Sequence, residues 1–134
     1  YFTTGLGSPE TMSAQGIGLA STGWGPDYSS ALSFWAPLID GRKIKPSANQ
    51  NFAELDLDEI NALLDSLEAA QTSAEAAQLN RKIEELVMQE AVYLPYAVDR
   101  IVLYRPKALT DIYVQIALGN QYDLVNIGKQ EIPQ

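Results

Sequence analysis

The chain has 134 residues, 46% of them hydrophobic and 19% charged, which suits one folded domain with a substantial core rather than a disordered segment. Its net charge of −8 argues against a nucleic-acid partner, since a phosphate-binding surface needs clustered basic residues and the nine here look scattered. With no cysteine or histidine, disulfides, thiolate metal sites and Ser-His-Asp triads are excluded. Of the familiar catalytic sets, only carboxylate pairs and lysine or tyrosine chemistry remain. We expect no catalytic residues and no cofactor.

The first part of the chain combines helix and strand signals with many glycines. Ser8-Pro9-Glu10 places a capping serine before proline and an early acid, which predicts a short helix ending near Gln15. Ile17 to Thr22 is a short apolar run that predicts a buried strand, broken by the Gly-rich stretch that follows. No run approaches the length of about 18 apolar residues that crosses a membrane.

A second short helix is expected between Tyr28 and Trp35. Leu32 and Trp35 share a helix face at i, i+3 spacing, and Pro37 discourages continuation of the helix. Residues 39–52 are polar and punctuated by proline, glycine and asparagine, which predicts an irregular surface loop.

Two longer helices have clearer signals. Asp56 to Glu59 resembles a capping box, and Thr72 to Glu75 forms a second one; each precedes apolar residues at helical spacing. The two apolar stripes are Ile60, Leu63, Leu64, Leu67 and Leu79, Ile83, Leu86, Val87. Because the link between the helices is short, we expect an antiparallel helical hairpin with both stripes buried.

The last third of the chain is rich in β-branched and aromatic residues. Val92–Val98 and Ile101–Tyr104 are predicted strands, with Pro95 at an edge or a bulge. Ile112–Leu118 alternates weakly, and Tyr122–Ile127 is expected to form the last strand. These elements predict an α/β fold in which the helical hairpin packs on a small mixed sheet.

Two familiar motifs are matched only in part. Gly16 to Ser21 resembles a dinucleotide-binding loop, but a Gly-Pro break follows where a helix should begin, so a turn that leads into a strand is the better interpretation. Asp56, Asp58 and Glu59 could suggest calcium, yet the central glycine and closing glutamate of a calcium loop are missing. We interpret these acids as charges at a helix N-terminus and expect no metal site.

An aromatic segment framed by glycine and proline surrounds Asp27. Trp24, Tyr28, Phe34 and Trp35 lie close to it in sequence, and such rings offer flat apolar walls. A carboxylate beside these walls would suit an ammonium group, through ion pairing and cation–π attraction. Two alternatives remain open: the rings could pack in the core, and Asp27 could cap a helix that begins near Tyr28.

Residues Gly23-Trp24-Gly25-Pro26-Asp27-Tyr28 resemble the Gly-Trp-x-x-Asp-Tyr segment of family 5 extracellular solute-binding proteins of ABC transporters, of the peptide-binding type. Further motifs follow in that family's order over residues 15–105, namely Asn49-Gln50-Asn51-Phe52, Glu59-Ile60-Asn61-Ala62-Leu63-Leu64, Arg81 and Tyr93-Leu94-Pro95-Tyr96. The chain departs from the family pattern at Asn61, where an acid is usual, and at Ser29-Ser30-Ala31, which replaces an Asp-Pro pair.

The resemblance implies a C-terminal part of such a protein, within a periplasmic-binding-protein-like (type II) lobe. Residues 1–94 would belong to the second lobe, and residues 95–134 would return toward the first. It implies three ligand-binding residues: Asp27 for the α-ammonium of a peptide, Trp24 as a pocket wall, and Tyr28. It also implies capture of a peptide or other small solute between two lobes, delivery to ABC permease subunits, and a place in the periplasm or on the cell surface as a membrane-anchored lipoprotein.

Two other classes of function remain open. A carboxylate-based hydrolase would need two of the many acids in a fixed geometry, and most of them lie on predicted solvent faces of helices. An acidic interaction module would use the helical hairpin, residues 57–90. Turnover of a peptide or glycoside would favour the first, and specific pull-down through the hairpin would favour the second.

Overall fold

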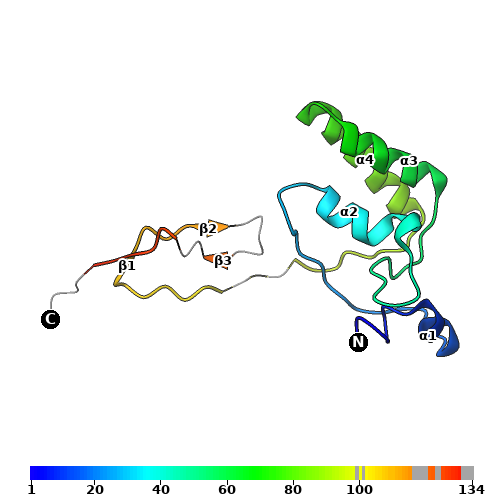
Figure 1. The fold of residues 1–134 in the computed structure, drawn as a ribbon, viewed down its shortest axis with the longest axis horizontal. Coiled ribbons are helices and arrows are strands. Elements are labelled where there is room, and N and C mark those ends of the chain that lie inside the picture. Colours follow the sequence, from blue (N-terminus) through cyan, green and yellow to red (C-terminus); the bar gives the residue numbers. More distant parts are fainter. Residues whose placement is uncertain (99, 101, 116–120, 123–124, 131–134) are drawn as a thin grey trace. The chain divides into compact units, whose positions relative to one another are not determined.

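The computed structural model describes residues 1–98, 100, 102–115, 121–122 and 125–130. Its helices are α1 (Pro9–Ala14), α2 (Leu32–Ile39), α3 (Asp58–Ala69) and α4 (Ser73–Gln89), with a 3₁₀ turn at Gly41–Lys43 (Figure 1). Its strands are β1 (Leu109–Thr110), β2 (Val114–Gln115), β3 (Gln121–Tyr122) and β4 (Gly128–Lys129). The chain divides into two compact units, one of Tyr1–Trp24 and Ser30–Pro95, the other of Gly25–Ser29 and Tyr96–Gln134. The content is α/β, as predicted.

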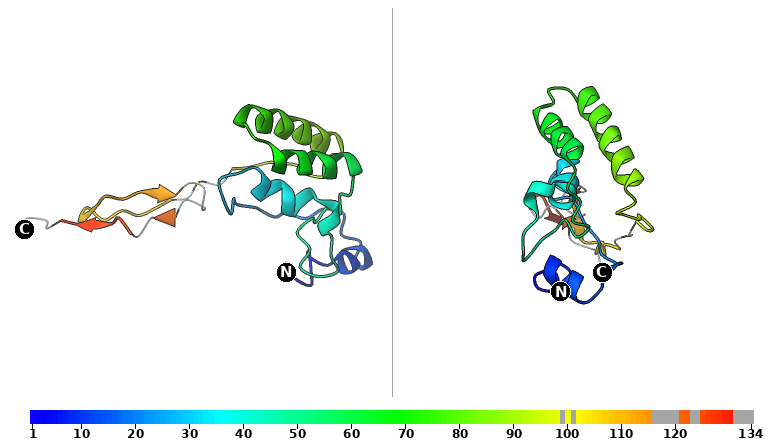
Figure 2. Two further views of the ribbon diagram at one scale, coloured as in Figure 1. Left: turned by 45° about the horizontal axis from the view of Figure 1, so that its top comes forward. Right: turned by 90° about the vertical axis from the view of Figure 1, so that its right-hand side faces the viewer.

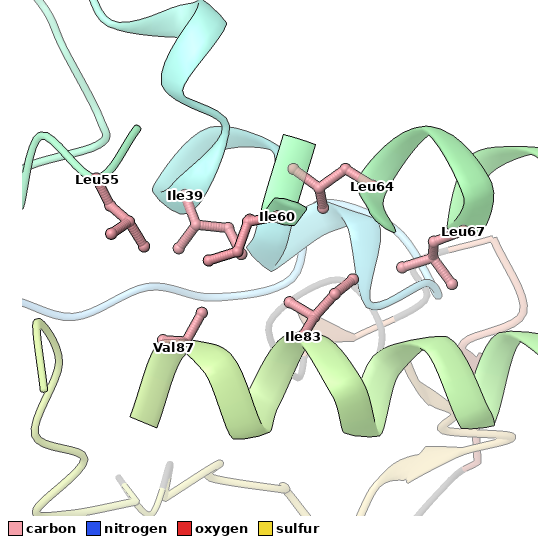
Figure 3. Packing of buried hydrophobic residues seen from close by; sticks show 7 residues of the cluster. All are labelled: Ile39, Leu55, Ile60, Leu64, Leu67, Ile83 and Val87. Atoms are coloured by element: carbon pink, nitrogen blue, oxygen red, sulfur yellow. The ribbon is translucent and has the colours of Figure 1, made fainter. Parts of the chain in front are cut away.

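The helical hairpin forms where the sequence predicts it. Helices α3 and α4 lie side by side, joined by residues 70–72, and α2 packs against α3 (Figures 1 and 2). The core of this unit consists of Ile39, Leu55, Ile60, Leu64, Leu67, Ile83 and Val87 (Figure 3). Each such side chain contributes about 1.5–3 kcal/mol when buried. The prediction that both stripes are buried is confirmed for five of their residues, namely Ile60, Leu64, Leu67, Ile83 and Val87. The other three, Leu63, Leu79 and Leu86, are half-buried against the same core.

The two predicted capping boxes differ in outcome. Thr72 caps α4, since its hydroxyl accepts a hydrogen bond of 3.2 Å from the backbone N–H of Glu75. At α3 the prediction is wrong: the N-cap residue is Leu57, and no side chain caps the helix. The Asp56 carboxylate instead accepts a hydrogen bond of 3.1 Å from the Asn61 side chain. Asn61 is buried, and the hydrogen bond from its side-chain amide occupies the Asp56 carboxylate that would otherwise cap the helix.

Helix α2 begins later and ends later than predicted. Its first residue is Leu32, where the backbone N–H donates to the Ser30 hydroxyl over 3.3 Å, and it continues through Pro37 to Ile39. The short helix α1 is confirmed, with the Ser8 hydroxyl accepting from the N–H of Thr11 over 3.3 Å.

The asparagine-rich stretch within residues 39–52 is irregular, but it is not wholly a surface loop as predicted. Asn49 and Asn51 are buried. The Asn51 amide donates to the Leu55 carbonyl over 2.8 Å, and its oxygen accepts from the Leu55 N–H over 3.0 Å. Asn49 donates to the Asn51 carbonyl over 2.7 Å. These amides supply backbone groups of the loop with partners that water would otherwise provide.

The strands are shorter and fewer than predicted among the described residues. β1 pairs antiparallel with β4, and β2 pairs antiparallel with β3. The pairing is therefore antiparallel rather than mixed, and in the first unit the helical hairpin packs on α2, since the described residues there include no strand.

Ile17–Thr22 and the described parts of Val92–Val98 and Ile101–Tyr104 form no strand, so these three predictions are wrong. Leu19 is 90% exposed, not buried. Among the described residues of the two later segments, Ile112–Leu118 contributes β2 and Tyr122–Ile127 contributes the end of β3. The residues of these predicted strands that lie outside the description are Ile101, Ile116, Ala117, Leu118, Asp123 and Leu124. A strand requires a hydrogen-bonded neighbour, which an apolar pattern alone does not specify.

Candidate ligand-binding site

Trp24 is fixed to helix α2 by its indole. The ring is half-buried, and its Nε1–H donates to the backbone carbonyl of Ser33 over 2.9 Å. In a regular helix that carbonyl would accept from the residue four positions later, but this residue is Pro37, which has no N–H. Trp24 thus supplies the donor that the proline lacks. Its polar group is committed to the protein, and the ring faces are what it can offer to a ligand.

Asp27 and Tyr28 lie in an irregular bend before α2. Both are exposed, Tyr28 by 50%. Because α2 begins at Leu32 with Ala31 as its N-cap and no side-chain cap, the hypothesis that Asp27 caps a helix near Tyr28 is wrong. Within the residues that the structure describes, the Asp27 carboxylate has no hydrogen bond or ion pair. Its charge is available to a cationic partner.

The three predicted site residues fall in different units. Trp24 belongs to the first unit, whereas Asp27 and Tyr28 belong to the second. The neighbouring ring of Trp35 follows the core-packing alternative: it packs against the core, and its Nε1–H donates to the Asn80 side chain over 2.9 Å. The aromatic segment therefore divides, with Trp35 joining α2 to α4 and Trp24 held beside the start of α2.

A charged cluster around Arg42 was not predicted from the sequence. The guanidinium donates to Asp40 over 2.8 and 3.1 Å and to Asp65 over 2.9 and 3.0 Å. Burial of Asp40 disfavours its ionised form, but the hydrogen bonds from Arg42 outweigh this and hold the pKa of the Asp40 carboxyl below its ordinary value. Asp65 is far from Arg42 in sequence, so only the fold reveals the pair.

The described residues contain no group of three or more aspartate or glutamate side chains that could hold a metal ion. Nor does any helix of the described residues have the length and apolar character needed to cross a membrane.

No family model matches the chain, and no curated protein matches it. Among solved structures, a protein named "Clavulanic acid biosynthesis oligopeptide binding protein 2" is similar to it, with 42% sequence identity and a TM-score of 0.92. The match covers 98% of this chain and 24% of that protein's chain, so this chain spans about a quarter of the other's length. The resemblance predicted from the motifs is thereby confirmed: this chain is related to oligopeptide-binding proteins of the family 5 solute-binding type.

Proposed function

We propose that the protein binds peptides and serves as the solute-binding component of an ABC importer. The observation that carries the proposal is the similarity, over nearly the whole chain, to a protein named for oligopeptide binding. That similarity favours binding over the hydrolase and interaction-module alternatives. Delivery to permease subunits and an extracytoplasmic location, in the periplasm or as a lipoprotein, are parts of the same proposal.

In this proposal Asp27 pairs with the α-ammonium of the peptide, and Trp24 and Tyr28 provide apolar walls. Three observations support these roles. Asp27 is exposed and caps no helix, Tyr28 is half exposed in the same bend, and the Trp24 indole is oriented by its bond to Ser33. An ammonium group gains both from a carboxylate and from the face of an aromatic ring.

The proposed arrangement assigns residues 1–94 to the second lobe of a type II binding protein and residues 95–134 to the return toward the first lobe. The boundary between the compact units after Pro95 supports a division near residue 94, while Gly25–Ser29 group with the later unit. Closure of the two lobes would exclude water from the peptide, which strengthens the ion pair at Asp27.

The substitution Asp27→Asn in the intact protein tests the role of the carboxylate. It should weaken binding of a peptide with a free N-terminus by about tenfold or more, because the ammonium then loses its partner in a desolvated site. An N-acetylated peptide of the same sequence should lose much less affinity. Asp58→Asn is the matched control, since Asp58 is exposed on α3 and the change in charge is the same.

Calorimetric titration of both peptides into wild type and the two variants gives the comparison, with circular dichroism to establish folding. Equal affinities of wild type and Asp27→Asn for the free peptide would remove Asp27 from the site. A similar loss for both peptides would show that the carboxylate acts on something other than the ammonium.

A further inference from the structure

A basic pocket lies in the first unit of this acidic protein. It has a volume of about 370 Å³ and is lined by Pro37, Arg42, Lys43, Ile44, Lys45 and Gln50. Three of the nine basic residues thus occupy four consecutive positions, so the expectation of scattered basic residues is wrong here. The lining holds three cations and no acid, although the chain carries a net charge of −8.

The cations of the pocket are differently engaged. Arg42 is held by two carboxylates, and Asp40 also caps the 3₁₀ turn by accepting a hydrogen bond of 3.1 Å from the Arg42 backbone N–H. The Lys43 ammonium lies 3.7 Å from the Asp40 carboxylate, longer than a strong charge-assisted hydrogen bond. Lys45 has no ion pair among the described residues, and its side chain is exposed. The Lys45 ammonium is therefore unengaged among the described residues, and the Lys43 ammonium is only loosely paired with Asp40.

The uncharged part of the lining adds to this chemistry. Gln50 offers an amide donor, while Pro37 and Ile44 provide apolar surface. A volume of about 370 Å³ is at the lower end of the range for ligand pockets. Asp40 and Asp65, which contact Arg42, offset part of the positive charge of the pocket. More distant acids weaken the attraction little, since salt screens exposed charges beyond about 8 Å at physiological ionic strength.

We propose that this pocket binds a small oxyanion, a phosphate or a carboxylate, through Lys43 and Lys45. The oxyanion would accept charge-assisted hydrogen bonds from the two ammonium groups, and Arg42, already bound to Asp40 and Asp65, would position them. The site differs in charge from the cation-binding role proposed for Asp27, so the two can be tested separately.

The test titrates inorganic phosphate and butyrate, in separate experiments, into the intact protein at low ionic strength. The double variant Lys43→Gln, Lys45→Gln is compared with Lys82→Gln, Lys107→Gln, which makes the same change in charge at exposed positions outside the lining. We expect the pocket variant to lose about tenfold or more in affinity, because a hydrogen bond to a charged group is worth at least that factor. The control variant should lose less than about twofold.

The relative affinities of the two anions identify the source of the oxyanion. Tighter binding of butyrate would assign the apolar lining to the alkyl part of a carboxylate, and tighter binding of phosphate would assign the site to phosphate; either result supports the proposal. Failure of both anions to bind saturably would overturn it. So would equal losses in the pocket and control variants, which would show a general effect of charge.

Discussion

The hydrogen bond from the Trp24 indole to the Ser33 carbonyl is open to a direct test, because two substitutions act on the same acceptor. Trp24→Phe removes the donor and keeps an aromatic ring. The Ser33 carbonyl then loses its indole donor, and Pro37 cannot replace it. An unsatisfied polar group in such a place costs about 1–3 kcal/mol, in addition to the smaller area that Phe buries.

Pro37→Ala restores the missing N–H at the position from which a helix satisfies the Ser33 carbonyl. In that background the same Trp24→Phe substitution should lower the free energy of unfolding by less than it does in wild type, with a difference of at least about 1 kcal/mol. The reason is that the backbone N–H of the new alanine can donate to the Ser33 carbonyl instead. The loss of buried ring area is common to both backgrounds and cancels in the double-mutant cycle.

Urea unfolding of the four proteins, followed by circular dichroism, gives the coupling free energy. A value within about 0.5 kcal/mol of zero would refute the idea that Trp24 compensates for Pro37. The control cycle crosses Trp35→Phe with Pro37→Ala. Because the Trp35 indole donates to the Asn80 side chain and shares no acceptor with residue 37, its coupling should be about zero, within about 0.5 kcal/mol.

Two further outcomes are expected in the first unit. Ile83→Ala should destabilise the protein by about 2–5 kcal/mol in urea unfolding, because Ile83 is fully buried in the core, whereas Leu19→Ala at an exposed position should change stability by less than about 0.5 kcal/mol. Burial raises the pKa of Tyr93 to about 12, and its hydroxyl donates to the Leu38 carbonyl over 2.8 Å. The neutral phenol is thus favoured by folding, so its contribution is complete below the ordinary pKa of about 10 and is lost as pH rises toward 12. Unfolding free energies from pH 9 to 12 should fall more steeply for wild type than for Tyr93→Phe, and parallel curves would contradict the assignment.

The helical hairpin could be predicted from the sequence because its signals are local and repeated. Ile60, Leu64, Ile83 and Val87 recur at helical spacing, and a three-residue link leaves little choice but antiparallel packing. The cap at Thr72 is equally local, since its acceptor and donor are three residues apart. At α3 the same local rule failed, because the Asp56 side chain binds Asn61 instead.

The strands could not be predicted because their partners are not encoded in the segment itself. Val98 and Val102 have the β-branched side chains of a strand, yet they are 95% and 92% exposed and belong to no described strand. A similar limit applies at Ala91, just after α4, where a positive φ of 53° is unexpected for a residue with a Cβ. A left-handed residue just after the C-cap is a common helix end, but glycine usually occupies that position, so alanine gives no signal of it.

The candidate site shows how one wrong boundary changes the chemistry assigned to a residue. With a helix starting near Tyr28, Asp27 would be its cap and its charge would be engaged; with α2 starting at Leu32, the carboxylate is left exposed. Likewise, a rule that ends helices at proline hides the Ser33 carbonyl, which Trp24 reaches because Pro37 lies inside α2. In the proposed site Trp24 therefore acts through its ring faces alone. Any hydrogen bond that selects among peptides must come from other groups, and Asp27 supplies the charge.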